Sequence, residues 1–389
     1  MRVHPIKVDT DELSRRLGVI EREHIGKAGA EDVAHMEKME RWVKRCTGLG
    51  YATAWMCPNP LSALFLSTAV FGRWTVLAHH ISHRAFDRCE EAPDRFSSKH
   101  WARGPRRRFS DWLDWIEPQS WHEEHNILHH YRLGEEADPD VVEHNLDWLR
   151  QAKVPEALRY AVSLSLATVW KPIYYAPAAL KAQRQAAARR KREDVPKENL
   201  FNLGTWLPVT KSGRDLWMQS WLPYAGWKFG VVPLMYLPLS PLAVINVWLN
   251  TLMAEVLTNL HGFAVIVPNH AGDDLMRFDE PTGHRGEFYL RQIVGSVNFD
   301  CGSDVNDFLH GFLNYQIEHH IWPTATPLQL RRAQPHVKAL CEELGIPYRQ
   351  QHVAKRIKKL LDIMIGKTSM ISGEEGLELL TSSPSYPNR

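Results

Sequence analysis

The chain has 389 residues, with 47 Lys and Arg against 45 Asp and Glu, and a net charge of +2. This near balance excludes a protein that binds nucleic acid through a strongly basic overall field. The five cysteines stand singly without a CxxC pair, which favours neither a disulfide scaffold nor a thiolate zinc site and fits a reducing, cytosol-facing environment.

Several apolar runs interrupt the polar chain. Residues 61–78 approach the ~20 residues needed to cross a bilayer, and residues 160–180 form a second run. Residues 221–268 are long enough for two more spans, joined at a Ser-Pro break. The mean hydropathy of −0.35 is typical of a soluble protein, but this average includes the long polar segments between the runs.

The remaining segments are charged. We expect a charged, helical N-terminal extension at residues 1–48. We expect one membrane domain at residues 49–360, which contain all the apolar runs, and a disordered tail at residues 361–389. Tryptophans beside basic segments are typical of helices at a membrane surface. We therefore expect four tryptophans to lie at the interface: Trp112, Trp115, Trp121 and Trp322.

Three histidine clusters follow one another along the chain. Their sequences are HHISH at 79–83, HNILHH at 125–130 and QIEHH at 316–320. Each cluster puts imidazoles on adjacent turns of a helix or at its end, where an i,i+4 pair can hold one metal ion. Three such clusters exceed what a single zinc ion needs and favour two metal ions.

An eighth histidine is expected from the last apolar run. Asn259 and His261 lie inside this run, and His270 lies just beyond its end. Polar and ionisable residues in such a run mark functional sites, because leaving them unpaired in hydrocarbon is costly.

The spacing excludes three other kinds of metal site. His122 and His125 are three residues apart, whereas the HExxH motif of zinc proteases places its histidines four apart. The PCxxC signature of zinc deaminases is absent, and the Glu and His residues do not match the Glu-x-x-His motifs of carboxylate di-iron bundles.

At these three clusters the chain resembles the membrane fatty acid desaturase family. That family has histidine boxes of the forms HxxxH, HxxxHH or HxxHH, and H/QxxHH, in the order and separation found here. The phrase LNYQIEHHIWP at 313–323 is similar to the acyl-lipid and front-end branch, in which Gln replaces the first His of the third box. The resemblance covers residues 61–348.

The resemblance implies an all-α fold with about four transmembrane helices and a cytosolic helical cap that holds a di-iron site. The implied iron ligands are His79, His83, His125, His129, His130, His270, His319 and His320. His270 is preferred to His261 because it lies at the end of the last span. His79 is preferred to His80 because its i,i+4 spacing to His83 matches the box.

Four further residues stay open as ligands or as their neighbours. Gln316 is expected to contact a metal directly or through water, and Asn259 is a weaker candidate. His122 is a candidate partner of a ligand or a ligand itself, and His310 either supports a ligand in the same way or has a packing role. No catalytic residue is expected beyond the ligands.

The implied reaction is O2-dependent desaturation of the acyl chain of a lipid or acyl thioester, by an integral membrane protein with its active site on the cytosolic side. The HPGG motif of a fused haem domain is absent, so electrons are expected from a separate ferredoxin- or cytochrome-type donor. Residues 106–108 and 189–192 are basic, and serve either to dock an acidic donor or as ordinary positive-inside flanks.

Two alternatives remain. One is a hydroxylase or ketolase of fatty acyl, sphingoid or carotenoid chains on the same di-iron scaffold. The other is a soluble, non-redox metal-binding protein, which the low mean hydropathy permits.

Overall fold

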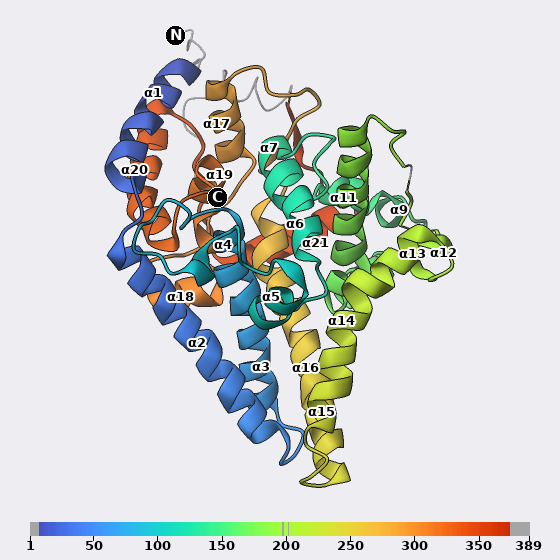
Figure 1. The fold of residues 1–389 in the computed structure, drawn as a ribbon. Helices are drawn as coiled ribbons and strands as arrows, with labels where there is room; N and C mark the ends of the chain where they lie inside the picture. The colour runs from blue at the N-terminus through green and yellow to red at the C-terminus, as the bar shows by residue number, and fades with distance from the viewer. Residues whose placement is uncertain (1–7, 197, 201, 374–389) are drawn as a thin grey trace.

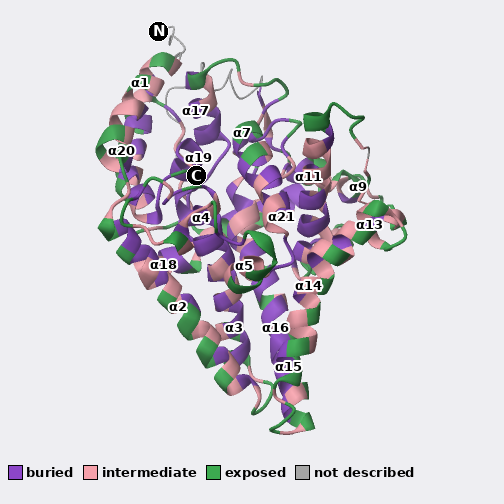
Figure 2. Ribbon diagram, in the orientation of Figure 1, coloured by how far each residue is buried: buried purple, intermediate pink, exposed green. Residues whose placement is uncertain are grey.

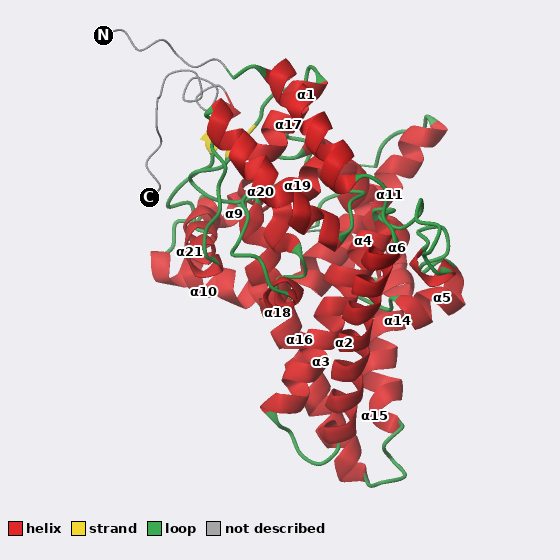
Figure 3. Cartoon of the chain, turned by 90° about the vertical axis from the view of Figure 1, so that its left-hand side faces the viewer, coloured by secondary structure: helices red, strands yellow, loops and turns green. Residues whose placement is uncertain are grey.

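The computed structural model describes residues 8–196, 198–200 and 202–373. Almost all regular structure in these residues is helical, and the helices form a broad cap above a tapering stem (Figure 1; Figure 3). The predicted all-α fold is therefore confirmed.

Three helices form the centre of the stem. They are α2 (Ala30–Ala54), α3 (Pro60–Gly72) and α16 (Pro241–Ile266), and both α2 and α16 pack along α3 (Figure 1). Inside this packing, the hydroxyl groups of Thr258 and Ser67 lie 3.2 Å apart. A hydroxyl pair of this kind satisfies polar groups between two apolar helices.

Two helices in the described part of the chain are long and apolar enough to cross a membrane. The first is Pro60–Ser82, in which α3 continues through the π-helical segment η2 (Arg73–Ala78) into α4 (His79–Ser82). The second is Pro241–Asn269, which is α16 together with the 3-10 turn η8 (Val267–Asn269). The first ends in the first histidine cluster, and the second ends beside His270.

The other two predicted spans are interrupted. Residues 160–180 are divided among α10 (Glu156–Ala167), the π-helical η5 (Lys171–Tyr175) and α11 (Ala176–Lys191). A nearly continuous helical leg precedes α16 and runs down to the tip of the stem (Figure 1). Its segments are α13 (Lys211–Leu216), η6 (Trp217–Trp221), α14 (Leu222–Ala225), η7 (Gly226–Val231) and α15 (Val232–Leu234).

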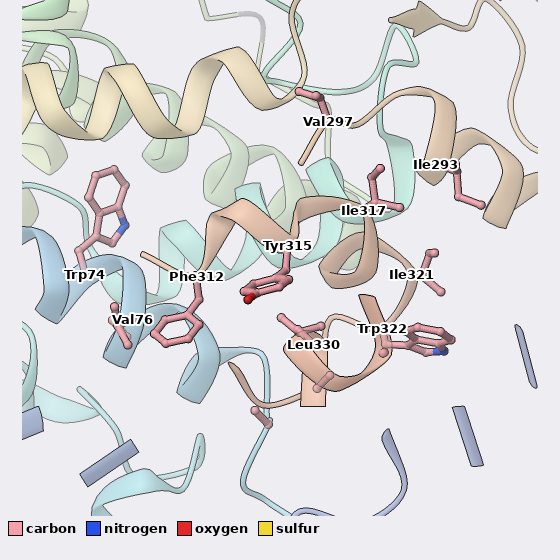
Figure 4. Packing of buried hydrophobic residues seen from close by; sticks show 14 of the residues in the cluster. Trp74, Val76, Ile293, Val297, Phe312, Tyr315, Ile317, Ile321, Trp322 and Leu330 are labelled. Atoms are coloured by element: carbon pink, nitrogen blue, oxygen red, sulfur yellow. The ribbon is translucent and has the colours of Figure 1, made fainter. Parts of the chain in front are cut away.

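The cap gathers the remaining segments over the top of the stem. They are α1 (Thr10–Ile20), η1 (Glu21–Ile25), η3 (Asp94–Phe96), α5 (Gly104–Asp111), α6 (Pro118–Trp121), η4 (His122–His129), α7 (His130–Arg132), α8 (Val142–Asn145), α9 (Asp147–Arg150), α12 (Leu203–Trp206), α17 (Arg285–Val294), α18 (Asp304–Leu309), η9 (Leu313–Tyr315), α19 (Gln316–Ile321), α20 (Pro327–Leu344) and α21 (Val353–Met364). Their apolar core includes residues on both sides of the third histidine cluster, with Phe312 and Leu330 on one side and Ile317 on the other (Figure 4).

Both predicted extensions contribute ordered structure. Helix α1 buries Leu13 and Leu17, and α2 continues past the predicted boundary at residue 48. At the other end, α21 runs beyond residue 360, and β2 (Ile371–Ser372) pairs in parallel with β1 (Met276–Arg277). The last part of the predicted tail, residues 374–389, lies outside the described residues.

The predicted interfacial position of four tryptophans is wrong. All four are buried: Trp112, Trp121 and Trp322 belong to the main core of the cap, which Figure 2 shows to be densely buried around its centre, and Trp115 belongs to a separate cluster with Leu216 and Tyr224. The physical reason is that three of these rings pack into the core that contains the histidine clusters, whereas the indole N–H of Trp115 donates to Glu255 of α16. Trp121, for example, stacks on the His125 ring with 4.7 Å between ring centroids.

Candidate metal centre

The three histidine clusters and His270 meet in the cap. They form two groups, within each of which the potential ligand nitrogens lie within 4.8 Å of one another. The larger group contains five residues, His79, His83, His125, His130 and His319, and the smaller contains three, His129, His270 and His320. These eight residues are the eight implied ligands, brought together from four distant segments. Their role as ligands stays a prediction.

Local helix geometry divides adjacent histidines between the two groups. Successive residues of a helix point about 100° apart. Each of the adjacent pairs His129–His130 and His319–His320 therefore contributes one imidazole to the larger group and one to the smaller group. Segment η4 is π-helical, and the N–H of His130 donates to the carbonyl oxygen of His125. This i,i+5 bond brings His125 and His130 to the same side, with their Nε2 atoms 3.3 Å apart.

The larger group has the nitrogen arrangement of a metal site. His79 Nε2 lies 3.1 Å from His125 Nε2. Two nitrogens at this separation can share one transition-metal ion, because its bonds to imidazole are about 2.0–2.1 Å long. Both ring nitrogens of His319 are buried without a hydrogen-bond partner. Since buried polar atoms are normally satisfied, these unpartnered nitrogens fit a site that binds a metal ion.

The protonation state suits ligation. Burial first, and neighbouring imidazoles second, hold the pKa of His83, His125 and His130 well below the usual histidine value. The same two causes lower the pKa of His319 and His320. Neutral imidazole is the form that binds metal ions, so these five histidines do not need to lose a proton before a metal can enter.

Each histidine of the smaller group has its Nδ1 atom held by an acceptor. His129 Nδ1 lies 3.0 Å from Asp138 Oδ1, and His320 Nδ1 lies 2.9 Å from Gln292 Oε1. His270 Nδ1 lies 3.2 Å from the carbonyl oxygen of Gly295. Such partners fix the tautomer and the ring orientation, leaving Nε2 for a metal ion. Burial lowers the pKa of His129, but the Asp138 carboxylate outweighs it, so that the pKa is raised.

Replacing Asp138 should weaken this support. In addition to His129, the carboxylate accepts from the backbone N–H of Gly134 at 2.8 Å and of Asp140 at 2.9 Å. We expect Asp138→Asn to keep the fold and to lower metal affinity or activity about 10–100-fold, as for other partners of metal-ligating histidines. Metal titration monitored by absorbance would measure this, and an unchanged affinity would show that Asp138 does not orient His129.

Four of the predicted residues lie outside both groups. His80 Nδ1 contacts the carbonyl oxygen of Val76, and His122 Nδ1 contacts the side chain of Asn126. His261 Nε2 lies 2.7 Å from the carbonyl oxygen of Leu309, and its ring stacks on Phe71. The structure therefore places His270, rather than His261, beside the other histidines. His310 Nδ1 contacts the carbonyl oxygen of Asn306.

The two predicted amides have different positions. Gln316 lies at the site, with its Nε2 atom 2.8 Å from His270 Nε2. Asn259 belongs to a separate buried network, because its Oδ1 accepts from the backbone N–H of Lys171 and its Nδ2 donates to Glu255.

Carboxylates near the histidines were not predicted. Asp140 approaches His125 and His129, since one oxygen lies within 4.8 Å of a nitrogen of each. Glu124 is fully buried, and burial together with Asp140 raises the pKa of its carboxyl group well above the usual value. The available signal was the acidic turn at 135–140, directly after the middle cluster, because carboxylates commonly orient metal-binding histidines.

A cavity of about 580 Å³ opens onto the histidines. Its inner end is lined by ligand candidates from both groups: His79, His125, His129 and His270. The remaining wall is mainly apolar and aromatic and includes Trp74, Leu166, Trp170, Ile173 and Phe263. Such a wall fits an apolar chain placed directly beside the candidate metal centre.

A second pocket reaches the histidines separately. It has a volume of about 240 Å³, and its lining includes His130 and His320, which belong to different groups and whose rings stack with centroids 4.3 Å apart. Tyr131, Arg285 and Phe288 also line it. The large cavity and this pocket therefore contact different histidines.

Comparison with known proteins agrees with this arrangement. The model of the family described as fatty acid desaturase matches residues 53–352 of the chain. The chain is similar to an NADPH-dependent stearoyl-CoA 9-desaturase of Mycobacterium tuberculosis, with 34% identity over 106 residues, which is 25% of each protein. It is also similar to a Delta 8-(E)-sphingolipid desaturase of Lachancea kluyveri, with 30% identity over 177 residues, 40% of this chain and 29% of that protein.

A third relative is a Delta(8)-fatty-acid desaturase of Euglena gracilis, with 36% identity over 89 residues, 23% of this chain and 20% of that protein. The matched segments thus span less than a third of the length of these curated relatives. No solved structure gives a significant match.

Proposed function

The chain belongs to the fatty acid desaturase family, and on this premise we propose that it is a membrane-bound, O2-dependent desaturase with two iron ions. Membership makes it an oxidoreductase of lipid metabolism. The observation that carries the finer proposal is the pair of histidine groups at the end of an apolar cavity. The names of its relatives include acyl thioester, fatty acid and sphingolipid desaturases, so they leave the substrate of this chain to be argued.

The histidines would hold the two ions. The five-histidine group fits one ion, and the three-histidine group with Gln316 beside it fits the other. All-imidazole surroundings with positions left open suit redox-active iron. When bound, the iron ions supply the O2 activation needed to break unactivated C–H bonds, which no side chain can perform.

The protein's own residues position the chain and keep water away. Trp74, Trp170 and Phe263 give the cavity a shaped apolar wall, so that a methylene segment is held beside His79 and His125. Asp138 and Gln292 keep the imidazoles of His129 and His320 oriented. In the net reaction two hydrogens leave adjacent carbons as the C=C bond forms. One O2 becomes two waters by taking up those two hydrogens, two electrons from a donor and two protons.

We place the stem in the bilayer, with the cap on the cytosolic side. The two apolar helices Pro60–Ser82 and Pro241–Asn269 support this, since both run from the stem up into the cap (Figure 1) and end at the first histidine cluster and beside His270. The leg from α13 to α15 and the lower half of α2 would complete four passages. Exposed leucines near the tip of the stem, such as Leu234 and Leu242, suit contact with lipid.

Electrons would enter through the pocket that contains His130 and His320. A separate one-electron carrier docked there approaches both groups of histidines without crossing the acyl cavity. Arg285, whose side chain is 70% exposed and lies 3.9 Å from Glu21, offers positive charge beside the exposed Tyr131, which suits an acidic carrier, whereas Arg132 is paired with Glu135 at 3.1 Å. The basic segments proposed from sequence are partly engaged elsewhere, since Arg107 pairs with Asp111 and Arg190 with Glu123.

Product analysis tests the proposal. We expect expression of the chain in a host of known lipid content to add one C=C bond at a fixed position of an acyl chain. Mass spectrometry would detect this as the loss of two hydrogens and would locate the bond. A product that instead gains one oxygen atom would identify a hydroxylase and contradict the desaturase proposal.

A further inference from the structure

The outer end of the acyl cavity lies at a protruding part of the cap. Besides Trp148 of α9, its lining includes Leu200, Leu203 and Trp206, the last two from α12. Helices α9, α12 and α13 project together from one side of the molecule, at the level where cap and stem meet (Figure 1). We call residues 203–222 the shoulder.

The shoulder exposes large apolar side chains. Leu203 is 73% exposed, Val209 74% and Met218 65%, and Leu207 and Leu222 are also exposed. Single exposed apolar residues are common on soluble proteins, but a contiguous group is typical of a surface that binds a partner or a membrane. Leu203 both lines the cavity and is among the most exposed of these residues, so the apolar surface continues into the opening.

Tryptophans accompany this surface. Trp206, Trp217 and Trp221 pack against one another, with ring centroids 5.8 Å apart for Trp206–Trp221 and 5.3 Å for Trp217–Trp221. Each indole N–H donates to a backbone carbonyl oxygen. Tryptophans of this kind concentrate where protein passes from hydrocarbon to headgroups.

Cations complete the pattern of an interfacial surface. Lys211 and Arg214 are exposed on α13, within the shoulder. Lys181 lines both the acyl cavity and an adjoining open pocket of about 380 Å³. Beside it the carboxylate of Glu198 is neutralised by Arg184 at 2.5 Å. Apolar groups at the opening with positive charge close by match the acyl chains and phosphate of a phospholipid.

We propose that the shoulder lies in the headgroup region of the bilayer and opens the acyl cavity sideways to it, so that the substrate is an ester-linked acyl chain of a membrane phospholipid. This rests on the proposed desaturase function and deepens it. The phosphate would remain near Lys181 while the apolar chain passes Leu203 toward the histidines.

The position of the shoulder can be measured without catalysis. The full chain is reconstituted in nanodiscs that contain nitroxide-labelled phospholipid, and a genetically encoded fluorescent amino acid replaces Val209. Matched reporters replace Leu234 in the stem, 58% exposed, as the lipid reference, and Arg285 on top of the cap, 70% exposed at its side chain, as the water reference. A second reporter, which replaces Met218, tests the same surface independently in case the substitution at 209 disturbs the local fold.

We expect the reporters at 209 and 218 to be quenched at least half as strongly as the reporter at 234, and the reporter at 285 to stay bright. Quenching at 234 with none at 209 and 218 would overturn the inference and leave the membrane position of the stem intact, as expected if the shoulder binds another protein. No quenching at any position would overturn both the inference about the shoulder and the membrane position of the stem.

The substrate class needs a second measurement. Washed host membranes containing the wild-type chain and NADPH receive either a phospholipid with an isotope-labelled ester-linked acyl chain or the same labelled chain as a thioester. We expect the labelled phospholipid to be desaturated directly, before any label appears as thioester. Desaturation of the thioester alone would overturn the inference, whereas a labelled product from neither would contradict the desaturase proposal itself, with the quenching result still standing.

Discussion

His319→Ala should abolish desaturation and lower the metal content of the purified chain. His319 is buried, both of its ring nitrogens lack a partner, and it belongs to the five-histidine group. Loss of an outer partner of a metal ligand costs about 10–100-fold in affinity or activity, and loss of a ligand should cost more. The measurements are iron per chain by mass spectrometry and double-bond formation in membranes.

His80→Ala is the matched control. His80 is equally buried and directly follows His79, but its Nδ1 contacts the carbonyl oxygen of Val76 and it belongs to neither group. We expect this variant to keep its iron while losing some stability through the cavity left behind. Full iron in the His319 variant, or loss of iron only in the His80 variant, would contradict the ligand assignment.

Lys171→Met should destabilise the fold by about 3–5 kcal/mol, the usual cost of leaving one charge of a buried ion pair without its partner. Lys171 Nζ lies 2.8 Å from Asp114 Oδ2, and the two side chains are 0% and 1% exposed. The ammonium also lies 4.1 Å from the centre of the Trp74 ring, which lines the acyl cavity. Thermal or denaturant unfolding in detergent would measure the loss.

Adding Asp114→Asn to that variant should restore most of the stability. The double variant has no unpaired charge, and the carbonyl oxygen of the new amide side chain can still accept from the backbone N–H of Ile116, as Asp114 Oδ1 does. Replacement of a whole buried pair is often neutral. If Lys171→Met alone were as stable as the wild type, Asp114 would have to be protonated or hydrated rather than ion-paired.

The sequence predicted which histidines come together better than how they divide into two groups. The histidines are visible in sequence because imidazoles at i,i+4 and as adjacent pairs are uncommon without a ligand to hold. His270 was preferred to His261 because the family resemblance implies a ligand at the end of the last span, and the structure places it beside the other histidines. Which histidines share a group was not predicted, because it depends on the π-helical bond between His125 and His130.

Tertiary packing explains the other differences. Tryptophans such as Trp121 were predicted at a membrane surface from neighbouring charges, but they are buried against the histidines. Lys171 interrupts an apolar run in sequence, and its partner Asp114 comes from a segment too far along the chain for periodicity to reveal. The contact between Asp138 and His129 was likewise not predicted, since only the folded chain shows it.

The metal content of the purified wild-type chain tests the central claim most directly. Extraction should require detergent, and elemental analysis should find two iron ions per chain, as two separate groups of histidines predict. One zinc ion in a chain that is soluble without detergent would contradict the account.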